Sequence, residues 1–173
     1  MSEKITLIGK IGFEPENRTK KHNNQASWKK IAMVFFDGDV TDYYAWFINK
    51  RYSLQLNKPL RGAHISFIND SIRTLTKNGL ISLDEVDQKW ETAKKKWDGV
   101  EIPVVLNVNP RTNDKHWWLN VPHEERALLH SIREEVGLTP PTFGLHMSIG
   151  YANEKNIAHS EYIHNLIKKG LIN

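Results

Sequence analysis

Two short segments of the chain carry the same pair of side chains that can do acid–base chemistry. They read GAHISFI (residues 62–68) and GLHMSIG (residues 144–150), each a His-x-Ser among apolar residues. A β-strand places residues i and i+2 on the same face. The pattern therefore predicts two strands that present His64 with Ser66, and His146 with Ser148, on an open face. The same alternation puts Gly150 on that open face. It puts the middle residue of each motif, Ile65 or Met147, on the buried face.

Two histidines and two serines are suited to cleaving a phosphodiester without a metal. One group must take a proton from the attacking oxygen, and a second must give a proton to the leaving oxygen. An imidazole with a pKa near 6.5 can do either at neutral pH. The serine hydroxyls would donate hydrogen bonds to the non-bridging phosphate oxygens. With a ribose 2′-hydroxyl as the nucleophile, the product would be a 2′,3′-cyclic phosphate or its hydrolysis product.

Other interpretations of the two segments stay open at this point. The four side chains could be polar outer positions on two half-exposed strands. A metal site needs three or four convergent ligands, but each segment offers one imidazole. Asp70, which alternation places on the same face as His64, would lie roughly 20 Å from it along the strand. Ser148 differs from a Gly-x-Ser-x-Gly nucleophile elbow because His146 stands where a glycine is needed.

Composition restricts the class of protein. A length of 173 residues favours one domain over 1–173, with room for two lobes. The net charge of +4 suits an anionic ligand, and the absence of cysteine excludes disulfides, thiolate nucleophiles and cysteine-based zinc sites. No apolar run reaches the roughly 20 residues of a membrane span, and residues 1–4 lack the apolar region of a signal peptide. We therefore expect a cytoplasmic protein that does not contact a membrane.

The pattern along the chain predicts an α+β fold with antiparallel pairing. Strands are expected over residues 5–13, 28–36, 61–68, 102–108, 115–121 and 144–150, with the fourth and fifth paired to each other. Helices are expected over residues 41–52, 82–97, 122–136 and 156–169. Ser82 followed by Glu85 predicts a capping box for the second helix. Residues 14–25 are expected to form a loop, and residues 69–79 show no clear pattern.

At the two His-x-Ser segments the chain resembles the 2H phosphoesterase superfamily, the LigT-like proteins, whose signature is one His-x-Ser/Thr motif in each half of the fold. The resemblance implies a bilobed, pseudo-symmetric α+β fold with two antiparallel sheets flanked by helices around a central cleft. It also implies that His64 and His146 are catalytic and that Ser66 and Ser148 bind phosphate. The stretches DYYAW and KPLRGAH are most similar to phage anti-CBASS nucleases, which destroy cyclic oligonucleotide signals.

Five further residues are candidates for substrate binding. Lys58 and Arg61, close to the first motif, are candidates to neutralise phosphate charge. Trp117 and Trp118 are consecutive on an expected strand and so face opposite ways, which leaves at most one in the core and the other as a stacking platform. Tyr151 follows the second motif where the rim of a cleft is expected, and packing roles for the three aromatic residues stay open. The remaining histidines nearby are expected on the surface: His116, His123 and His130.

Three functions are compatible with these residues. The first is a metal-independent phosphodiesterase that cleaves the 3′–5′ bonds of cyclic di- or trinucleotides. The second is the same chemistry on an RNA end that carries a 2′,3′-cyclic phosphate. The third is a nucleotide- or RNA-binding module that does not cleave its ligand. We expect no cofactor, no metal and no obligate protein partner for any of the three.

Overall fold

The computed structural model describes residues 3–15, 29–77, 82–113 and 115–169. The loop expected over residues 14–25 lies outside the described residues from residue 16 onward. The strands are β1 (Lys4–Phe13), β2 (Lys29–Phe35), β3 (His64–Ser71), β4 (Glu101–Asn107), β5 (Arg111–Thr112), β6 (His116–Asn120) and β7 (His146–Tyr151). The helices are α2 (Asp39–Tyr52), α3 (Ile72–Lys77), α4 (Leu83–Trp97), the 3₁₀ turn η1 (His123–Glu125), α5 (Ala127–Glu135) and α6 (Glu154–Lys168).

All strands of the described chain form one antiparallel sheet of seven strands in the order β4-β1-β2-β3-β7-β6-β5. The predicted α+β class is therefore confirmed, but the prediction of two separate sheets is wrong. The two parts of the sheet meet where β3 pairs with β7, at Ile65 and Met147. This joint brings the two motif strands side by side in the middle of the sheet.

The predicted pairing of residues 102–108 with residues 115–121 is also wrong. Strand β4 pairs along its length with β1, from Lys4 opposite Asn107 to Lys10 opposite Glu101. The short strand β5 occupies the hairpin position beside β6 instead. Strand β4 is the edge strand opposite to β5, and its alternating apolar residues are buried.

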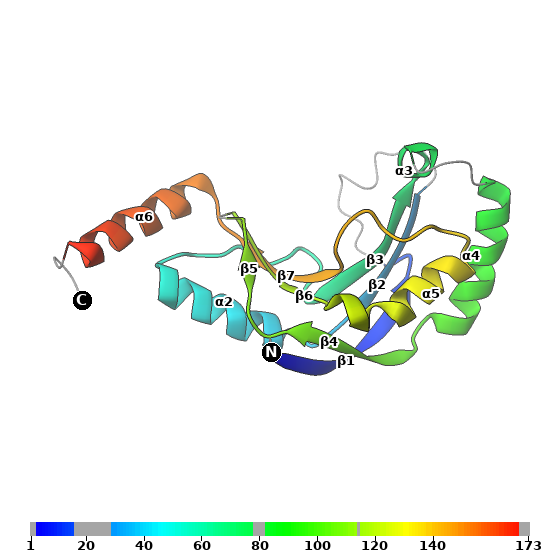
Figure 1. Cartoon of the computed structure of the whole chain (residues 1–173), viewed down its shortest axis with the longest axis horizontal. Coiled ribbons are helices and arrows are strands. Elements are labelled where there is room, and N and C mark those ends of the chain that lie inside the picture. The colour runs from blue at the N-terminus through cyan, green and yellow to red at the C-terminus, as the bar shows by residue number, and fades with distance from the viewer. Residues whose placement is uncertain (1–2, 16–28, 78–81, 114, 170–173) are drawn as a thin grey trace.

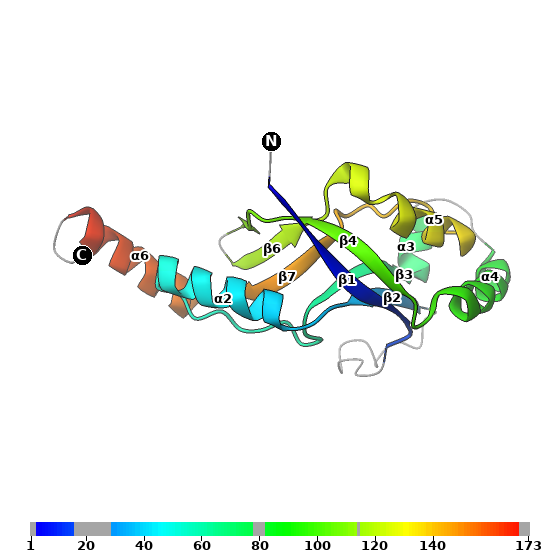
Figure 2. The ribbon, with the colours of Figure 1, turned by 90° about the horizontal axis from the view of Figure 1, so that it is seen from below.

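Helices lie at both ends of the sheet (Figures 1 and 2). Helices α2 and α6 lie at one end, and α3, α4 and α5 lie at the other. Helix α2 contacts β7, and α5 contacts β3. Strand β7 is therefore packed against α2, the helix that precedes β3 in the sequence. Strand β3 is packed against α5, the helix that precedes β7.

The expected helices form with small shifts of their ends. The backbone N–H of Glu85 donates to Ser82 Oγ at 3.4 Å, which confirms the predicted N-cap of α4. Helix α2 begins at Asp39, two residues before the expected start, and α3 fills part of the segment without a clear pattern. The single helix expected from Pro122 is divided into η1 and α5. No helix in the described part of the chain is long and apolar enough to cross a membrane.

Candidate active site

The two motif strands repeat the same alternation of exposure. His64 and Ser66 on β3 are half-buried, and so are His146 and Ser148 on β7. The residue between each pair, Ile65 or Met147, is fully buried. The predicted orientation of the four polar side chains, on the face opposite to the core, is therefore present in the structure.

A β-bulge follows the serine in both strands. Ala32 pairs with Ile68 while Met33 pairs with Ser66, so Phe67 is the extra residue of β3. In β7 the extra residue is Ile149, because Trp117 pairs with Gly150 and Trp118 with Ser148. The bulges stand at the same position relative to each motif histidine, and each reverses the alternation of the residues beyond it.

This reversal corrects two predictions made from strict alternation. Gly150, expected on the open face, is buried, and Asp70, expected on the side of His64, is only 3% exposed. Asn69 and Tyr151 are the exposed residues in their place. The open face beyond each serine therefore carries a side chain that strict alternation does not predict.

The four motif side chains line one cavity. Because β3 and β7 are antiparallel with Ile65 opposite Met147, His64 lies across from Ser148, and Ser66 lies across from His146. The cavity has a volume of about 280 Å³ and is completed by Asn69 and Phe143. The structure thus brings together both histidines and both serines predicted from the sequence.

Both imidazoles are held in the same way. Nδ1 of His64 lies 2.9 Å from the carbonyl oxygen of Gly62, and Nδ1 of His146 lies 2.8 Å from that of Gly144. A carbonyl oxygen can only accept a hydrogen bond, so each Nδ1 carries the proton and donates. Nε2 is then the nitrogen through which each imidazole can exchange a proton with a ligand. Gly62 has a φ of +68°, a backbone conformation that favours glycine.

The surroundings of His64 favour its neutral form. Burial lowers the pKa of His64 below its ordinary value of 6.5, and the charges of Arg61 and His146 lower it further. The hydrogen bond to the carbonyl of Gly62 acts in the opposite direction and is outweighed. His64 is therefore neutral at pH 7 and can accept a proton at Nε2.

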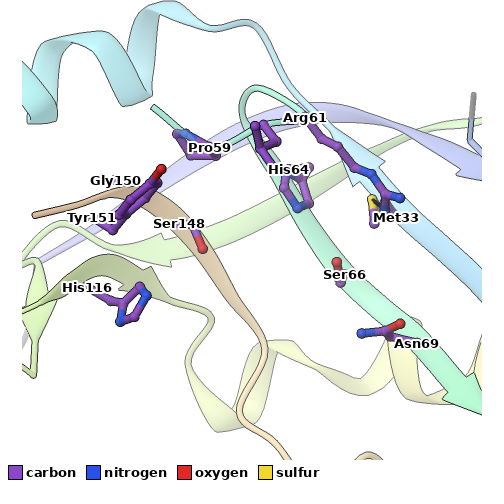
Figure 3. A pocket seen from close by; sticks show the side chains of 11 residues that line it. Met33, Pro59, Arg61, His64, Ser66, Asn69, His116, Ser148, Gly150 and Tyr151 are labelled. Carbon is purple, nitrogen blue, oxygen red and sulfur yellow. Dashed lines mark hydrogen bonds between the residues drawn. The ribbon is translucent and has the colours of Figure 1, made fainter. Parts of the chain in front are cut away.

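Two further cavities adjoin the central one. The first, of about 360 Å³, is shown in Figure 3 and shares His64, Ser66, Asn69 and Ser148 with the central cavity. Its other walls are Met33, Pro59, Leu60, Arg61, His116, Gly150 and Tyr151. The second, of about 460 Å³, shares Phe143, His146 and Ser148 with the central cavity, and its other walls are Asn113, His116, Trp117, Trp118, Asn120 and Gly144. Because the cavities share walls, they form one continuous cleft, and His116 and Ser148 border both side cavities.

The two tryptophans have different environments. Trp117 is 7% exposed and packs against Tyr52, with ring centroids 5.0 Å apart, although it also borders the second side cavity. Trp118 is half-buried, and its ring centroid lies 6.1 Å from that of His146. Trp118 is therefore the one whose ring is positioned beside a motif histidine.

The other predicted binding residues are divided between the cleft and the surface. Tyr151 is 43% exposed and lines the first side cavity, and so does Arg61, whose Nη1 lies 3.6 Å from Met33 Sδ. Lys58 is not among the residues that line the three cavities. Its ammonium group lies 2.9 Å from the carboxylate of Asp42.

Several residues of the cleft were not identified from the sequence. His116, expected on the surface, is exposed but lines both side cavities. Asn120 shares its strand face with Trp118, so alternation along β6 was a signal that could have found it. Asn113 lies in the turn between β5 and β6, and Phe143 lies in the connection from α5 to β7, where alternation gives no information.

Within the described residues, no group of three or more His, Cys, Asp or Glu side chains is placed to hold a metal ion. The comparisons give no relative from which a role could be transferred. No protein-family model, no curated protein and no solved structure matches the chain.

Proposed function

We propose that this chain is a metal-independent phosphodiesterase that cleaves the 3′–5′ bonds of cyclic di- or trinucleotides by acid–base catalysis. The observation that carries the proposal is the matched pair of imidazoles. His64 and His146 each donate through Nδ1 to a glycine carbonyl and line one cavity together with Ser66 and Ser148. Both Nε2 atoms are thus available to a phosphate bound between them.

In the proposed reaction a ribose 2′-hydroxyl is the nucleophile. Nε2 of His64 takes the proton of this hydroxyl while the 2′-oxygen forms a bond to phosphorus. The bond from phosphorus to O5′ breaks, and the protonated Nε2 of His146 gives its proton to O5′. The products are a 2′,3′-cyclic phosphate and a 5′-hydroxyl on one opened chain. Water can then open the cyclic phosphate with the two histidines in reversed roles.

The environment of His64 supports this division of roles. A general base must be neutral before the reaction, and burial together with the charge of Arg61 lowers the pKa of His64. His146 is then the general acid. The hydroxyls of Ser66 and Ser148, which line the same cavity, would donate hydrogen bonds to the non-bridging oxygens as negative charge develops there. The guanidinium of Arg61 adds a positive charge at the first side cavity.

The shape of the cleft supports a substrate with a nucleoside on each side of the reacting phosphate. Two side cavities adjoin the central one, and each contains aromatic side chains, Tyr151 in one and Trp118 in the other. Aromatic faces stack on nucleobases. A cyclic dinucleotide has this arrangement of base, phosphate and base. The repeated strand, bulge and histidine bond also support the pseudo-symmetric plan of a 2H phosphoesterase, to which phage anti-CBASS nucleases belong.

The test is a cleavage assay in EDTA with 3′,3′-cGAMP and with a short RNA that ends in a 2′,3′-cyclic phosphate. We expect the cyclic dinucleotide to be opened, and His64→Ala and His146→Ala each to abolish turnover. His123→Ala, on the exposed turn η1, is the matched control and should keep full activity.

Each other outcome has a defined meaning. Cleavage of the RNA end alone would assign the same site to RNA repair or processing. Activity retained in both cleft variants would exclude His/His catalysis. Tight binding of the cyclic dinucleotide without any product in the unmodified protein would identify a binding module instead of an enzyme.

A further inference from the structure

We propose that Asn69 is a further catalytic residue, whose side-chain amino group donates a hydrogen bond to the reacting phosphate in addition to those of Ser66 and Ser148. The inference rests on the proposed function, because it names a group that acts on the phosphate in the same cavity. Asn69 lines both the central cavity and the first side cavity. Within the described part of the chain its side-chain amide has no hydrogen-bond partner, so both of its N–H groups are available to a ligand.

The bulge at Phe67 places Asn69 on the open face of β3. Strict alternation from His64 would bury Asn69 and expose Asp70, but the extra residue reverses this order, and Asn69 is exposed while Asp70 is buried. Figure 3 shows the Asn69 amide projecting from β3 into the pocket. The bulge therefore adds a third polar side chain to the row that His64 and Ser66 begin.

The backbone at Asn69 is held from the buried side of the strand. Its N–H donates to Asp70 Oδ2 at 3.2 Å. The Asp70 carboxylate in turn accepts hydrogen bonds of 2.7 and 3.1 Å from the buried Arg133 guanidinium. A donor that projects from a fixed backbone needs little reorganisation when charge develops beside it, which is the condition for electrostatic catalysis.

Asn69 is the additional donor that the central cavity offers. Beyond the two histidines and the two serines, this cavity is lined by Asn69 and Phe143, and a phenyl ring has no hydrogen-bond donor. Arg61 lines the first side cavity but is not among the residues that line the central one. Within the cavity, further stabilisation of phosphate charge by a side chain must therefore come from the Asn69 amide.

The reacting phosphate can use another donor. A phosphodiester carries one negative charge, and attack by the 2′-oxygen brings a second one onto the non-bridging oxygens. Each serine hydroxyl supplies a single O–H, whereas an amide amino group supplies two N–H donors. Asparagine side chains aimed at such oxygens stabilise the charge as it develops in the transition state. Asn69 thus transfers no proton and acts through its hydrogen bonds alone.

Asn69 also makes the two ends of the cavity unequal. Tyr151 is its counterpart in the second motif, since each lies five residues after its motif histidine. Tyr151 lines the first side cavity and is not among the residues that line the central one. Because Ser66 lies across from His146, β3 runs beyond Ser66 past the His146 end of the cavity. The end at which His146 protonates the leaving oxygen therefore has a donor without an equivalent at the other end.

The experiment measures kcat and KM for 3′,3′-cGAMP in EDTA with Asn69→Ala and Asn69→Asp. Asn69→Ala should lower kcat by about 10²-fold and change KM much less, because the donor meets its largest charge in the transition state. Asn69→Asp has nearly the shape of asparagine but replaces the donors by a negative charge, so it should lose at least as much activity. Asn165→Asp, exposed on α6, introduces the same charge outside the three cavities and should keep full activity.

The order of the two Asn69 variants separates hydrogen bonding from packing. If the side chain only filled space, the aspartate of equal size would be the milder substitution. An Asn69→Asp protein more active than Asn69→Ala, or an unchanged kcat in Asn69→Ala, overturns the role of Asn69 and leaves the phosphodiesterase in place. Because the Asn69 side chain is exposed, both variants should unfold at the same temperature as the unmodified protein, so that a loss of kcat reports on the site.

Binding of inorganic phosphate gives a readout that does not depend on cleavage. At about pH 8 this ion is mainly a dianion, which is the charge that the reacting group gains in the transition state. A titration followed by ³¹P NMR should show binding to Asn69→Ala about tenfold weaker than to the unmodified protein, and Asn165→Ala should bind normally.

The two readouts together distinguish failure of this inference from failure of the enzyme. Absence of cleavage, with phosphate binding that Asn69→Ala weakens, overturns the phosphodiesterase and leaves Asn69 as a phosphate-binding residue. Absence of cleavage overturns both if the unmodified protein binds no phosphate, or if Asn69→Ala binds it equally well.

Discussion

Ile65 of β3 lies directly opposite Met147 of β7, and each is the middle residue of a His-x-Ser motif. In an antiparallel pair this register creates a local twofold relationship, in which the histidine of one motif faces the serine of the other. The bulges are related in the same way, because Phe67 and Ile149 each lie two residues after the middle residue of their motif. A phosphate bound at this joint would therefore meet equivalent groups from two sides, as in-line displacement requires.

The first prediction concerns the pH dependence of cleavage. Because burial lowers the pKa of His64, the acid limb of kcat/KM should have its midpoint below the ordinary value of about 6.5. His64 must lose its proton to act as the base, so activity should rise with pH through this midpoint. Substitution Arg61→Gln removes a nearby positive charge and should move the midpoint upward. An acid limb above pH 6.5, or one that Arg61→Gln does not move, would contradict this assignment.

The same pKa shift has a consequence for stability. The unfolded chain binds a proton at His64 with a pKa near 6.5, higher than that of the folded protein. Between the folded and unfolded pKa values the unfolded state binds more protons, so the stability of the fold falls as pH drops through that window. Urea titrations of the unmodified protein and of His64→Gln across this window should show a steeper decline for the unmodified protein. Parallel curves would mean that His64 is not shifted.

The serines should contribute through their hydroxyl groups. Ser66→Ala and Ser148→Ala each remove one donor to the transition-state charge, which costs about 10²- to 10³-fold in kcat where such donors have been removed from oxyanion sites. Ser66→Thr and Ser148→Thr keep the hydroxyl and should keep most of the activity. Steady-state kinetics of the four variants distinguish the effect of the hydroxyl from that of side-chain volume. Equal losses in the alanine and threonine variants would indicate packing instead of catalysis.

Periodicity predicted the parts of the fold and the site that follow a regular backbone. The strand positions of His64 and His146 and the cap at Ser82 were found because each is a local pattern. The pairing of β4 was missed because partner choice between strands is non-local, and the alternation within β4 does not reveal that its partner is β1. Gly150 and Asp70 were assigned to the wrong face because a bulge inserts one residue without a sequence signal of its own.

The bulge in β3 is held by a buried charge pair, which gives a fourth prediction. Arg133 of α5 donates two hydrogen bonds to the Asp70 carboxylate, at 2.7 and 3.1 Å, and a third to the carbonyl of Phe67 at 2.9 Å. Its side chain is 1% exposed. Arg133→Met would leave the Asp70 carboxylate buried without its cation, which typically costs about 3–5 kcal/mol. Chemical denaturation should show this loss, and Lys89→Met, which removes an exposed pair with Glu85, should leave the midpoint almost unchanged.

The outcome of that substitution can separate charge from packing. In Arg133→Met/Asp70→Leu both charged groups are gone, and the isolated buried carboxylate no longer exists. The double variant should regain much of the stability lost in Arg133→Met, since apolar replacements of buried ion pairs are often neutral. A double variant as unstable as Arg133→Met would mean that the bonds of Arg133 to the carbonyls of Phe67 and Thr139, and not the charge pair, hold this region together.

Directly after the bulge in β7, another segment of the chain approaches the backbone closely at Gly150. A Cβ added there would lie 2.8 Å from the carbonyl oxygen of Asn57 and 3.0 Å from Leu56 Cβ. Asn57 and Tyr151 exchange backbone hydrogen bonds of 2.8 and 3.0 Å, so the added methyl must push this segment away. Gly150→Ala should cost about 1–3 kcal/mol, as overpacking of a closely packed site does. It should also raise KM, because Tyr151 and Pro59 line the first side cavity next to this contact.

Gly38 offers the matched control for this substitution. A Cβ at Gly38 would meet no atom within 4 Å, and the residue has a φ of −68° that any amino acid adopts. Gly38→Ala should therefore leave the stability unchanged or raise it slightly, by restricting the unfolded chain. Thermal unfolding and steady-state kinetics of the two variants provide the comparison. If Gly150→Ala unfolds like Gly38→Ala and keeps the KM of the unmodified protein, the backbone approach at Asn57 does not position the wall of the cleft.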